Sequence, residues 1–318
     1  MTAHEPTTKE WIRTLIEPGQ LLAWAMSYYT KVCFEAVFQR GEVLAPLLET
    51  SKLRDEAFGR FWVDFSSARP TSTQQQNQDQ DQDQDQKQTP LQPPQIQNST
   101  DLIPPILARA SGVVLDVGPG TGTQMPLLRG RAQAIKTIYG AEPCRGLHAE
   151  LRARAEEEGL GEKYQVLSCG AAARELVPEL QREGLLPAGD VEGVLASTDG
   201  VFDTIVCVRV LCSVPELERT AQELYALLRP GGQLLVVEHV VNPWRTAKGS
   251  IVARVMQAVY GFFGWSWFVG NCCLDRDTEM ALRAAADRDG GWEVVELDRW
   301  FGRSPIPYIS GVLVKKST

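Results

Sequence analysis

The sequence predicts an α/β fold, in which a doubly wound, seven-stranded sheet has helices on both faces and follows an N-terminal helical extension. After Thr100, short β-branched runs alternate with segments of helical pattern, and such alternation is typical of a largely parallel sheet. A glycine-rich turn joins the first run to the first helix, and sheets of this kind bind ligands at such turns. Before Thr100 the pattern is first helical and then of low complexity, so we expect three parts.

The first part, residues 1–70, is predicted to be helical. Leu21–Phe38 has a broad apolar stripe at helical spacing, and Trp11–Ile16 forms a shorter apolar-faced turn. Val43–Leu48 and Phe58–Phe65 add apolar, aromatic-rich surface. This segment is either a lid over a substrate pocket, a plain structural helix pair, a dimer face or a surface that lies on a membrane.

The second part, residues 71–100, is predicted to be a disordered linker. Residues 74–88 contain only Gln, Asp, Asn and Lys, and prolines 90, 93 and 94 follow. A run without apolar side chains cannot bury enough surface to offset the entropy cost of ordering. The third part, residues 101–318, is then the main domain.

Alternating strands and helices follow one another through this main domain. The predicted strands are Gly112–Val117, Thr137–Ala141, Tyr164–Ser168, Phe202–Val208, Gln233–His239, Trp292–Arg299 and Ile309–Lys315. The predicted helices between them are Gln124–Arg131, Arg145–Glu158, Ala171–Glu183 and Pro215–Leu228. The last helix is expected to end there because Arg-Pro-Gly-Gly follows at 229–232, and proline and glycine terminate helices.

Charge and cysteine usage exclude some classes of protein. A net charge of −8 argues against a protein that follows nucleic acid through a basic face. The seven cysteines form no CxxC pair, and His4, His148 and His239 lie far from any cysteine cluster in the sequence, so we expect no metal site. Cys272-Cys273 is either a redox pair or, as we favour, two small apolar side chains in a packed loop.

Met1–Glu10 has no signal-peptide character, and the prediction is a cytoplasmic protein with free thiols.

The glycine-rich turn reads Asp116-Val-Gly118-Pro-Gly120-Thr-Gly122. Glycine lets the backbone turn tightly and approach a ligand without a clash from Cβ. The spacing is G-x-G-x-G, whereas the dinucleotide fingerprint needs G-x-G-x-x-G, which disfavours a nicotinamide enzyme. No Gly-Lys-Ser/Thr follows, which excludes a P-loop.

Glu142 ends the second predicted strand, twenty residues after Gly122. An acidic side chain at this point accepts hydrogen bonds from the ribose hydroxyls of an adenosine ligand. Alone, it could equally be an exposed acid in a strand-end turn. Beside the glycine turn, we favour the ribose role.

These motifs together resemble the class I S-adenosylmethionine (SAM)-dependent methyltransferases, over roughly residues 102–316. Asp116–Gly122 is similar to their first motif, Glu142 to the acid after strand two, Phe202–Val208 to their fourth-strand motif and residues 227–235 to the turn before strand five. The resemblance implies a Rossmann-like seven-stranded sheet and SAM as cofactor.

A narrower resemblance is to the animal thiol methyltransferases of the endoplasmic reticulum and lipid droplets. It rests on Val210–Val214, Glu238–Val240, Gly270–Thr278 and Pro307–Gly311. Before residue 100 the chain departs from them, because it lacks their uninterrupted apolar anchor and has the Gln/Asp insertion.

The candidate cofactor-binding residues follow from the turn, the strand ends and the resemblance. They are Asp116, Gly118, Gly120, Gly122, Glu142, Gly170, Ala171 and Val208. Gly170 and Ala171 follow strand three, where relatives contact adenine; many relatives have an acid there and this chain has none.

His239 and Arg209 are the candidate catalytic residues. His239 ends strand five beside the expected acceptor pocket, and its ordinary pKa suits a general base near neutral pH. The alternative is a structural histidine at the strand end. Arg209 either pairs with a carboxylate in the site or points outward to Glu216 or Glu218.

The acceptor is expected to be a small hydrophobic or aromatic molecule, which fits specialised metabolism. Seven aromatic residues between strand five and the last strands either wall its pocket, pack in the core or face a membrane: Trp244, Tyr260, Phe262, Phe263, Trp265, Trp267 and Phe268. The predicted function is SAM-dependent methylation of S, O or N, without a nucleic-acid partner and with peripheral membrane contact left open. The alternative is a non-catalytic protein that binds SAM or a partner through its N-terminal helices.

Overall fold

The computed structural model of the chain describes residues 7–67, 96–197 and 199–317. Residues 71–95 of the expected linker lie outside the described residues. Residues 96–100, which the sequence assigned to the linker, are part of the fold. The side chain of Ile96 is buried, and the Asp101 carboxylate accepts hydrogen bonds from the backbone N–H groups of Gln97 and Asn98. Composition missed this because Ile96 is a single apolar residue in a polar stretch.

The predicted fold class is confirmed by a seven-stranded sheet in the order β3-β2-β1-β4-β5-β7-β6. All neighbours pair in parallel except β7, which is antiparallel to both β5 and β6. The strands are β1 (Gly112–Val117), β2 (Ile135–Ala141), β3 (Tyr164–Leu167), β4 (Phe202–Val208), β5 (Leu228–His239), β6 (Val294–Trp300) and β7 (Tyr308–Val314). Strand β5 begins five residues before the predicted Gln233, because Leu228 already pairs with Phe202 ahead of a register shift.

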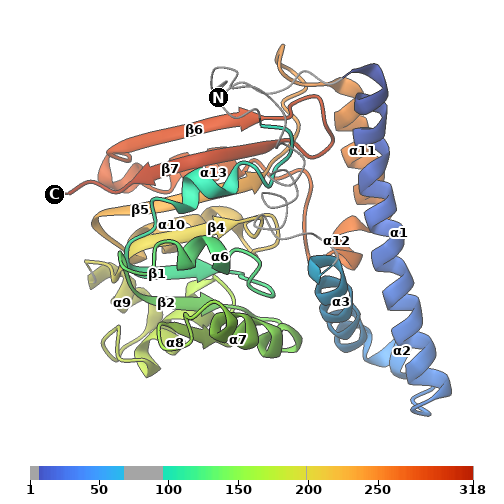
Figure 1. Cartoon of the computed structure of the whole chain (residues 1–318), viewed down its shortest axis with the longest axis horizontal. Coiled ribbons are helices and arrows are strands. Elements are labelled where there is room, and N and C mark those ends of the chain that lie inside the picture. The colour runs from blue at the N-terminus through green and yellow to red at the C-terminus, as the bar shows by residue number, and fades with distance from the viewer. Residues whose placement is uncertain (1–6, 68–95, 198, 318) are drawn as a thin grey trace, which may run out of the picture.

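Helices cover both faces of the sheet and enclose two hydrophobic cores (Figure 1). One core includes apolar residues from α8 (Ala173–Arg182), α9 (Val191–Ser197), α10 (Leu217–Leu227) and α13 (Thr278–Ala284). The other includes residues from α5 (Ile103–Leu107), α6 (Met125–Arg129) and α7 (His148–Glu157). The short 3₁₀ helices η1 (Arg145–Leu147) and η2 (Asp287–Asp289) complete the domain.

The N-terminal helices stand beside one edge of the sheet, together with helices from the segment after β5 (Figure 1). These are α1 (Thr8–Phe38), α2 (Ala45–Leu48), α3 (Thr50–Ser67), α11 (Ile251–Phe262) and α12 (Trp265–Phe268). A third hydrophobic cluster joins α1 and α3 to α11 and α12, with Phe61 fully buried in it. The extension is therefore packed onto the main domain.

Helix α1 corrects the prediction of two separate helical pieces before residue 40. It starts at a capping box between Thr7 and Glu10 and continues through Pro18 to Phe38. Proline removes one backbone donor from a helix, but Tyr260 contacts α1 on both sides of Pro18: its hydroxyl donates to Leu15 O and its ring lies against Gly19. In the described part of the chain, no helix has the length and apolar character that crossing a membrane requires.

The parallel register brings the predicted site residues to the same edge of the sheet. Val117 at the end of β1 pairs with Ala141 of β2 and with Cys207 of β4. The residues that follow these strands therefore lie next to one another at the carboxyl edge. The strand order reverses between β1 and β4, and open α/β sheets bind ligands at such a switch point.

Candidate functional site

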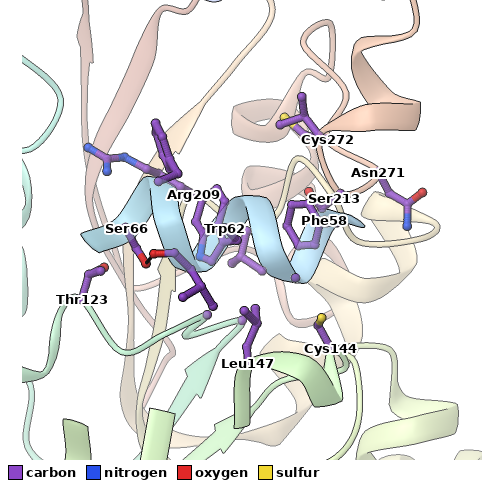
Figure 2. A pocket seen from close by; sticks show the side chains of 18 of the residues that line it. Phe58, Trp62, Ser66, Thr123, Cys144, Leu147, Arg209, Ser213, Asn271 and Cys272 are labelled. Carbon is purple, nitrogen blue, oxygen red and sulfur yellow. Dashed lines mark hydrogen bonds between the residues drawn. The ribbon is translucent and has the colours of Figure 1, made fainter. Parts of the chain in front are cut away.

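A cavity of about 1230 Å³ lies at the carboxyl edge of the sheet. Ligand pockets commonly measure roughly 300–1,000 Å³, so this one has room for two small molecules. In Figure 2, Cys144 and Leu147 enter it from one side, and Arg209 and Cys272 from the other. Phe58 and Trp62 of α3 lie between them in this view.

The glycine turn forms one end of this cavity, with Gly118 and Gly120 in its lining. Both have positive φ, 58° and 61°. A Cβ at Gly118 would lie 2.4 Å from Cγ2 of Val210, and one at Gly120 would lie 2.6 Å from Nε1 of Trp62. Only glycine fits at both positions, so the sequence requirement is steric as well as conformational.

Glu142 is buried beside this turn and also lines the cavity. Its Oε2 accepts a hydrogen bond from Gly120 N at 2.9 Å, and its Oε1 accepts one from Cys144 N at 2.8 Å. Burial raises the pKa of this carboxyl, while the two N–H donors lower it. Each oxygen retains acceptor capacity after these bonds, so the carboxylate fits a ribose diol.

The other residues predicted to bind the cofactor do not line the cavity. Asp116, Gly122, Gly170, Ala171 and Val208 are not among the lining residues. Gly170 N donates to Glu175 Oε2 at 2.8 Å, and Ala171 packs in the hydrophobic core, so the turn after β3 is occupied by its own contacts. Pro143–Leu147, after β2, line the cavity at this end instead.

Asp116 has a structural environment inside the sheet. Its Oδ2 accepts a hydrogen bond from Tyr164 Oη at 2.8 Å, and burial raises its pKa to about 6. The residue is 5% exposed and does not line the cavity. Asp116 is therefore held inside the sheet by Tyr164 of β3 and has a structural role at the end of β1.

Helix α3 covers the glycine turn and supplies half of the Phe, Trp and Tyr residues that line the cavity; the others are Tyr28, Trp265 and Tyr308. Phe58, Trp62 and Phe65 line the cavity. Thr121 Oγ1, in the glycine turn, donates a hydrogen bond to Ser66 Oγ at 2.9 Å. The sequence left a lid over a substrate pocket as one of four alternatives for this aromatic segment, because apolar spacing does not show which surface a helix covers.

The aromatic wall expected after β5 is only partly present. Of its seven residues, Trp265 lines the cavity. Phe262 and Phe263 are exposed, while Tyr260 is buried and donates a hydrogen bond to Leu15 O at 2.5 Å. Helix α11 thus packs one face against α1 and exposes another face to solvent.

Arg209 lies at the cavity and, within the described residues, does not form the outward ion pair with Glu216 or Glu218 that the sequence also allowed. Its Nη2 donates to Ser99 Oγ at 2.9 Å and to Thr100 Oγ1 at 3.1 Å, while Glu216 pairs with Arg174 instead. Its buried Nε has no hydrogen-bond partner within the described residues. The guanidinium is thus positioned by residues that sequence reasoning placed in a linker.

The loop after β4 is fixed by Glu238, a fully buried carboxylate. Its Oε1 accepts hydrogen bonds from the N–H groups of Val210 and Leu211 at 2.8 and 3.0 Å. Burial raises its pKa to about 7, and the two N–H groups lower it. These two hydrogen bonds hold Val210 against Gly118 and orient the residues that follow, including Cys212.

His239 lies in the cavity wall beside two cysteines. Its Nε2 is 3.1 Å from Cys272 Sγ, and Trp265 Nε1 donates to the same sulfur at 3.2 Å. Burial lowers the pKa of His239, but Cys212 and Glu238 raise it more, so the net shift is upward. His239 is far from these cysteines in the sequence but beside them in space, because strand ends distant in sequence meet at this edge.

Comparisons with known proteins bear on the family of the chain. A family model described as a methyltransferase domain matches residues 91–297. Thiol S-methyltransferase TMT1B of Homo sapiens is 41% identical over 87 residues, 27% of this chain and 33% of that protein. Phosphatidylethanolamine N-methyltransferase of Cereibacter sphaeroides is 30% identical over 156 residues, 48% of this chain and 63% of that protein.

These matches span less than two thirds of the relatives' own lengths. Among solved structures, an O-methyltransferase family protein from Burkholderia thailandensis superposes with a TM-score of 0.47 at 12% identity, covering 96% of this chain and 72% of that one.

Proposed function

Because the chain belongs to the methyltransferase domain family, whose methyl donor is SAM, we propose that it methylates a sulfur, oxygen or nitrogen atom of a small apolar molecule. The observation that carries this proposal is one continuous cavity with two chemically different ends. The glycine turn and Glu142 form a polar end that fits an adenosine ligand. The other end is lined by Phe58, Trp265 and His239, which suits an apolar acceptor.

When bound, SAM supplies an activated methyl group on a sulfonium. The protein's task is then to align the acceptor and exclude water. Gly118 and Gly120 allow close approach of the backbone, and Glu142 binds the ribose. Arg209 is proposed to pair with the amino-acid carboxylate of the donor, since its Nε is buried at the cavity and free of hydrogen bonds within the described chain.

A lid role for α3 is part of this proposal. Trp62 lies directly over Gly120, and Ser66 is bonded to Thr121. Because α3 touches the turn that would hold the donor, it must shift or open for exchange of product and substrate. Acceptors of specialised metabolism would fit the size of the cavity.

The test is binding followed by turnover. Calorimetry with SAM and with its demethylated product should show saturable binding of both. Mass spectrometry of thiol, phenol and amine acceptors incubated with SAM should then show a gain of one methyl mass for at least one class. Binding without any methylated product would favour the alternative, a non-catalytic SAM-binding protein; absence of binding at millimolar ligand would remove the enzyme proposal.

A general-base role for His239 stays a prediction. Replacement by glutamine removes the titrating group while keeping a polar side chain of similar size. A strong loss of turnover at saturating SAM is expected if the ring accepts the acceptor's proton. Near-normal turnover of His239→Gln contradicts the role.

We also propose peripheral membrane contact, with a lipid surface as the occupant. Exposed apolar side chains occur along α1, the turn and α2 that follow it, and α11, at Ile16, Phe34, Phe38, Val43, Leu44, Leu47, Leu48, Val255, Phe262 and Phe263. Leu47 and Leu48 are 77% and 76% exposed and Phe262 is 86% exposed. Contact of such large apolar side chains with water is unfavourable, so a surface that covers them would stabilise the protein. Apolar acceptors dissolved in a bilayer would then reach the cavity directly.

Sedimentation with phosphatidylcholine vesicles tests this proposal. The wild type should sediment with vesicles, and Leu47→Asp with Leu48→Asp should reduce the bound fraction several-fold. A control variant, Glu150→Gln, changes an exposed residue on α7 and none of the exposed apolar side chains, and it should behave as wild type. Equal binding of all three, or a dimer that hides these residues, contradicts the proposal.

A further inference from the structure

Three residues that are distant in sequence meet at the apolar end of the cavity. Cys212 follows β4, His239 ends β5 and Cys272 follows α12. One donor atom from each lies within 4.8 Å of the other two, and the residues are only 2%, 5% and 8% exposed. All three also line the cavity.

From this cluster we infer a binding site for Zn²⁺ or a similar thiophilic divalent ion, with one coordination position open to the cavity. Two cysteine sulfurs and one imidazole are the ligand types that zinc prefers. With Zn–S near 2.3 Å and Zn–N near 2.0–2.1 Å, ligand atoms of one tetrahedral ion lie roughly 3.5–3.8 Å apart. The observed grouping needs only small side-chain adjustments to reach this geometry.

The hydrogen bonds of His239 differ from those of a structural histidine. His148, elsewhere in the same domain, bonds the backbone oxygen of Glu142 through Nε2 at 2.8 Å. His239 instead directs Nε2 at Cys272 Sγ, and its buried Nδ1 has no partner in the described part of the chain. The ring is therefore held by sulfur contacts and not by the backbone, which leaves it able to bind an ion.

The surroundings suit a thiolate pair bound to a dication. Trp265 Nε1 donates to Cys272 Sγ, and such outer hydrogen bonds fix metal ligands and support their charge. Cys212 Sγ makes long contacts to Arg209 O at 3.8 Å and to Ser213 Oγ at 3.5 Å, and it also interacts with the side chains of Cys272 and His239. Two thiolates neutralise a 2+ ion, which reduces the cost of placing charge in a buried cluster.

Three protein ligands and one open position are typical of catalytic zinc, whereas structural zinc has four protein ligands. The open position would face the part of the cavity assigned to the acceptor, so we infer that the acceptor is a thiol; this step rests on the proposed function. On binding, the acceptor's S–H bond breaks and its proton leaves to water. The sulfur keeps both electrons and forms a bond to the metal. Free thiols with pKa near 8.5 are largely protonated at neutral pH, and coordination deprotonates them. His239 then acts as a ligand in place of a base.

Cobalt is a suitable probe because thiolate–Co²⁺ bonds absorb visible and near-ultraviolet light. The full chain, purified under reducing conditions and freed of metal, should bind one equivalent of Co²⁺ with thiolate charge-transfer bands, and Zn²⁺ should displace it. Cys212→Ser, Cys272→Ser and His239→Gln should each weaken Zn²⁺ affinity by more than the roughly 10–100-fold that loss of an outer-shell partner causes. Cys33→Ser, on α1 and outside the cluster, should bind as the wild type does.

A measurement on the wild type alone guards against variants that fail to fold. Zn²⁺ should slow alkylation of Cys212 and Cys272 at least tenfold, read by peptide mass spectrometry, and leave the half-buried Cys33 unaffected. Absence of thiolate–cobalt bands, equal protection of all cysteines or a Cys212–Cys272 disulfide in freshly purified protein would overturn the metal site.

Failure of this inference is distinguishable from failure of the proposed function. SAM binding, measured by calorimetry on metal-free protein, reports the polar end of the cavity alone. A protein that binds SAM and methylates a phenol or amine, but binds no metal, keeps the proposed function and refutes the metal site. A protein that binds zinc but not SAM keeps the metal site and refutes the acceptor assignment.

Discussion

The carboxylate of Glu142 offers the sharpest test of the cofactor site. Glu142→Gln keeps the size of the side chain but replaces one acceptor oxygen by an NH₂ group. In the native site, both oxygens accept backbone N–H groups, from Gly120 at 2.9 Å and from Cys144 at 2.8 Å. In the variant, one of these donors faces another donor.

The expected loss of SAM affinity follows from the negative charge on the acceptor oxygen that the substitution removes. Hydrogen bonds to charged groups contribute about 1.5–3 kcal/mol each. Losing one ribose hydroxyl contact of this kind should weaken SAM binding roughly 10- to 100-fold, since about 1.4 kcal/mol is a factor of ten. The free energy of unfolding without ligand should fall less than this, because burial penalises the native carboxylate and its removal returns part of that cost.

Calorimetry with the demethylated product of SAM and with its 2′-deoxy analogue separates ribose recognition from damage to the turn. The wild type should bind the deoxy analogue much more weakly, and Glu142→Gln should discriminate far less between the two ligands. Glu150→Gln, an exposed change on the next helix, serves as the matched control. If Glu142→Gln keeps wild-type affinity and discrimination, Glu142 does not bind the ribose and the reasoning is refuted.

Three further changes test the turn, the buried acid and the packing of the extension. Gly120→Ala should destabilise the protein by roughly 1–3 kcal/mol in urea denaturation, because φ is 61° and the new Cβ would overlap Trp62; an unchanged midpoint contradicts the close approach. Burial raises the pKa of Asp116 to about 6 from 3.8, so its stabilising contribution is present at low pH and is lost as the pH rises through about 6. Relative to the wild type, Asp116→Asn should therefore gain up to about 3 kcal/mol between about pH 4 and pH 7, since Asn still accepts from Tyr164; a flat difference across this range contradicts the shift. Phe61→Ala should cost about 3–5 kcal/mol in the same denaturation, and a loss under about 1 kcal/mol would mean that the extension is not packed on the domain.

Local sequence patterns predicted the sheet closely. Strands β1 and β4 have the predicted bounds, because central parallel strands are buried on both faces and appear as continuous apolar runs. The glycine turn and Glu142 were also correctly brought to one site, since the carboxyl ends of neighbouring parallel strands share an edge.

Contacts between distant segments were not predictable in the same way. Arg209 bonds Ser99 and Thr100, which composition assigned to a linker, and the aromatic wall comes from α3 more than from α11. Apolar spacing shows that a helix has a buried face but not which surface it covers.

The sequence alone determined the fold class and indicated that Gly118, Gly120 and Glu142 lie together at one end of the cavity, because periodicity, a strand-end acid and glycine spacing are local properties. The tertiary structure decided what surrounds the other end. Cys212, His239 and Cys272 lie apart in the chain, and only the sheet order and the helices beside it bring their donor atoms within 4.8 Å. Such convergence depends on how elements pack, which no local pattern encodes.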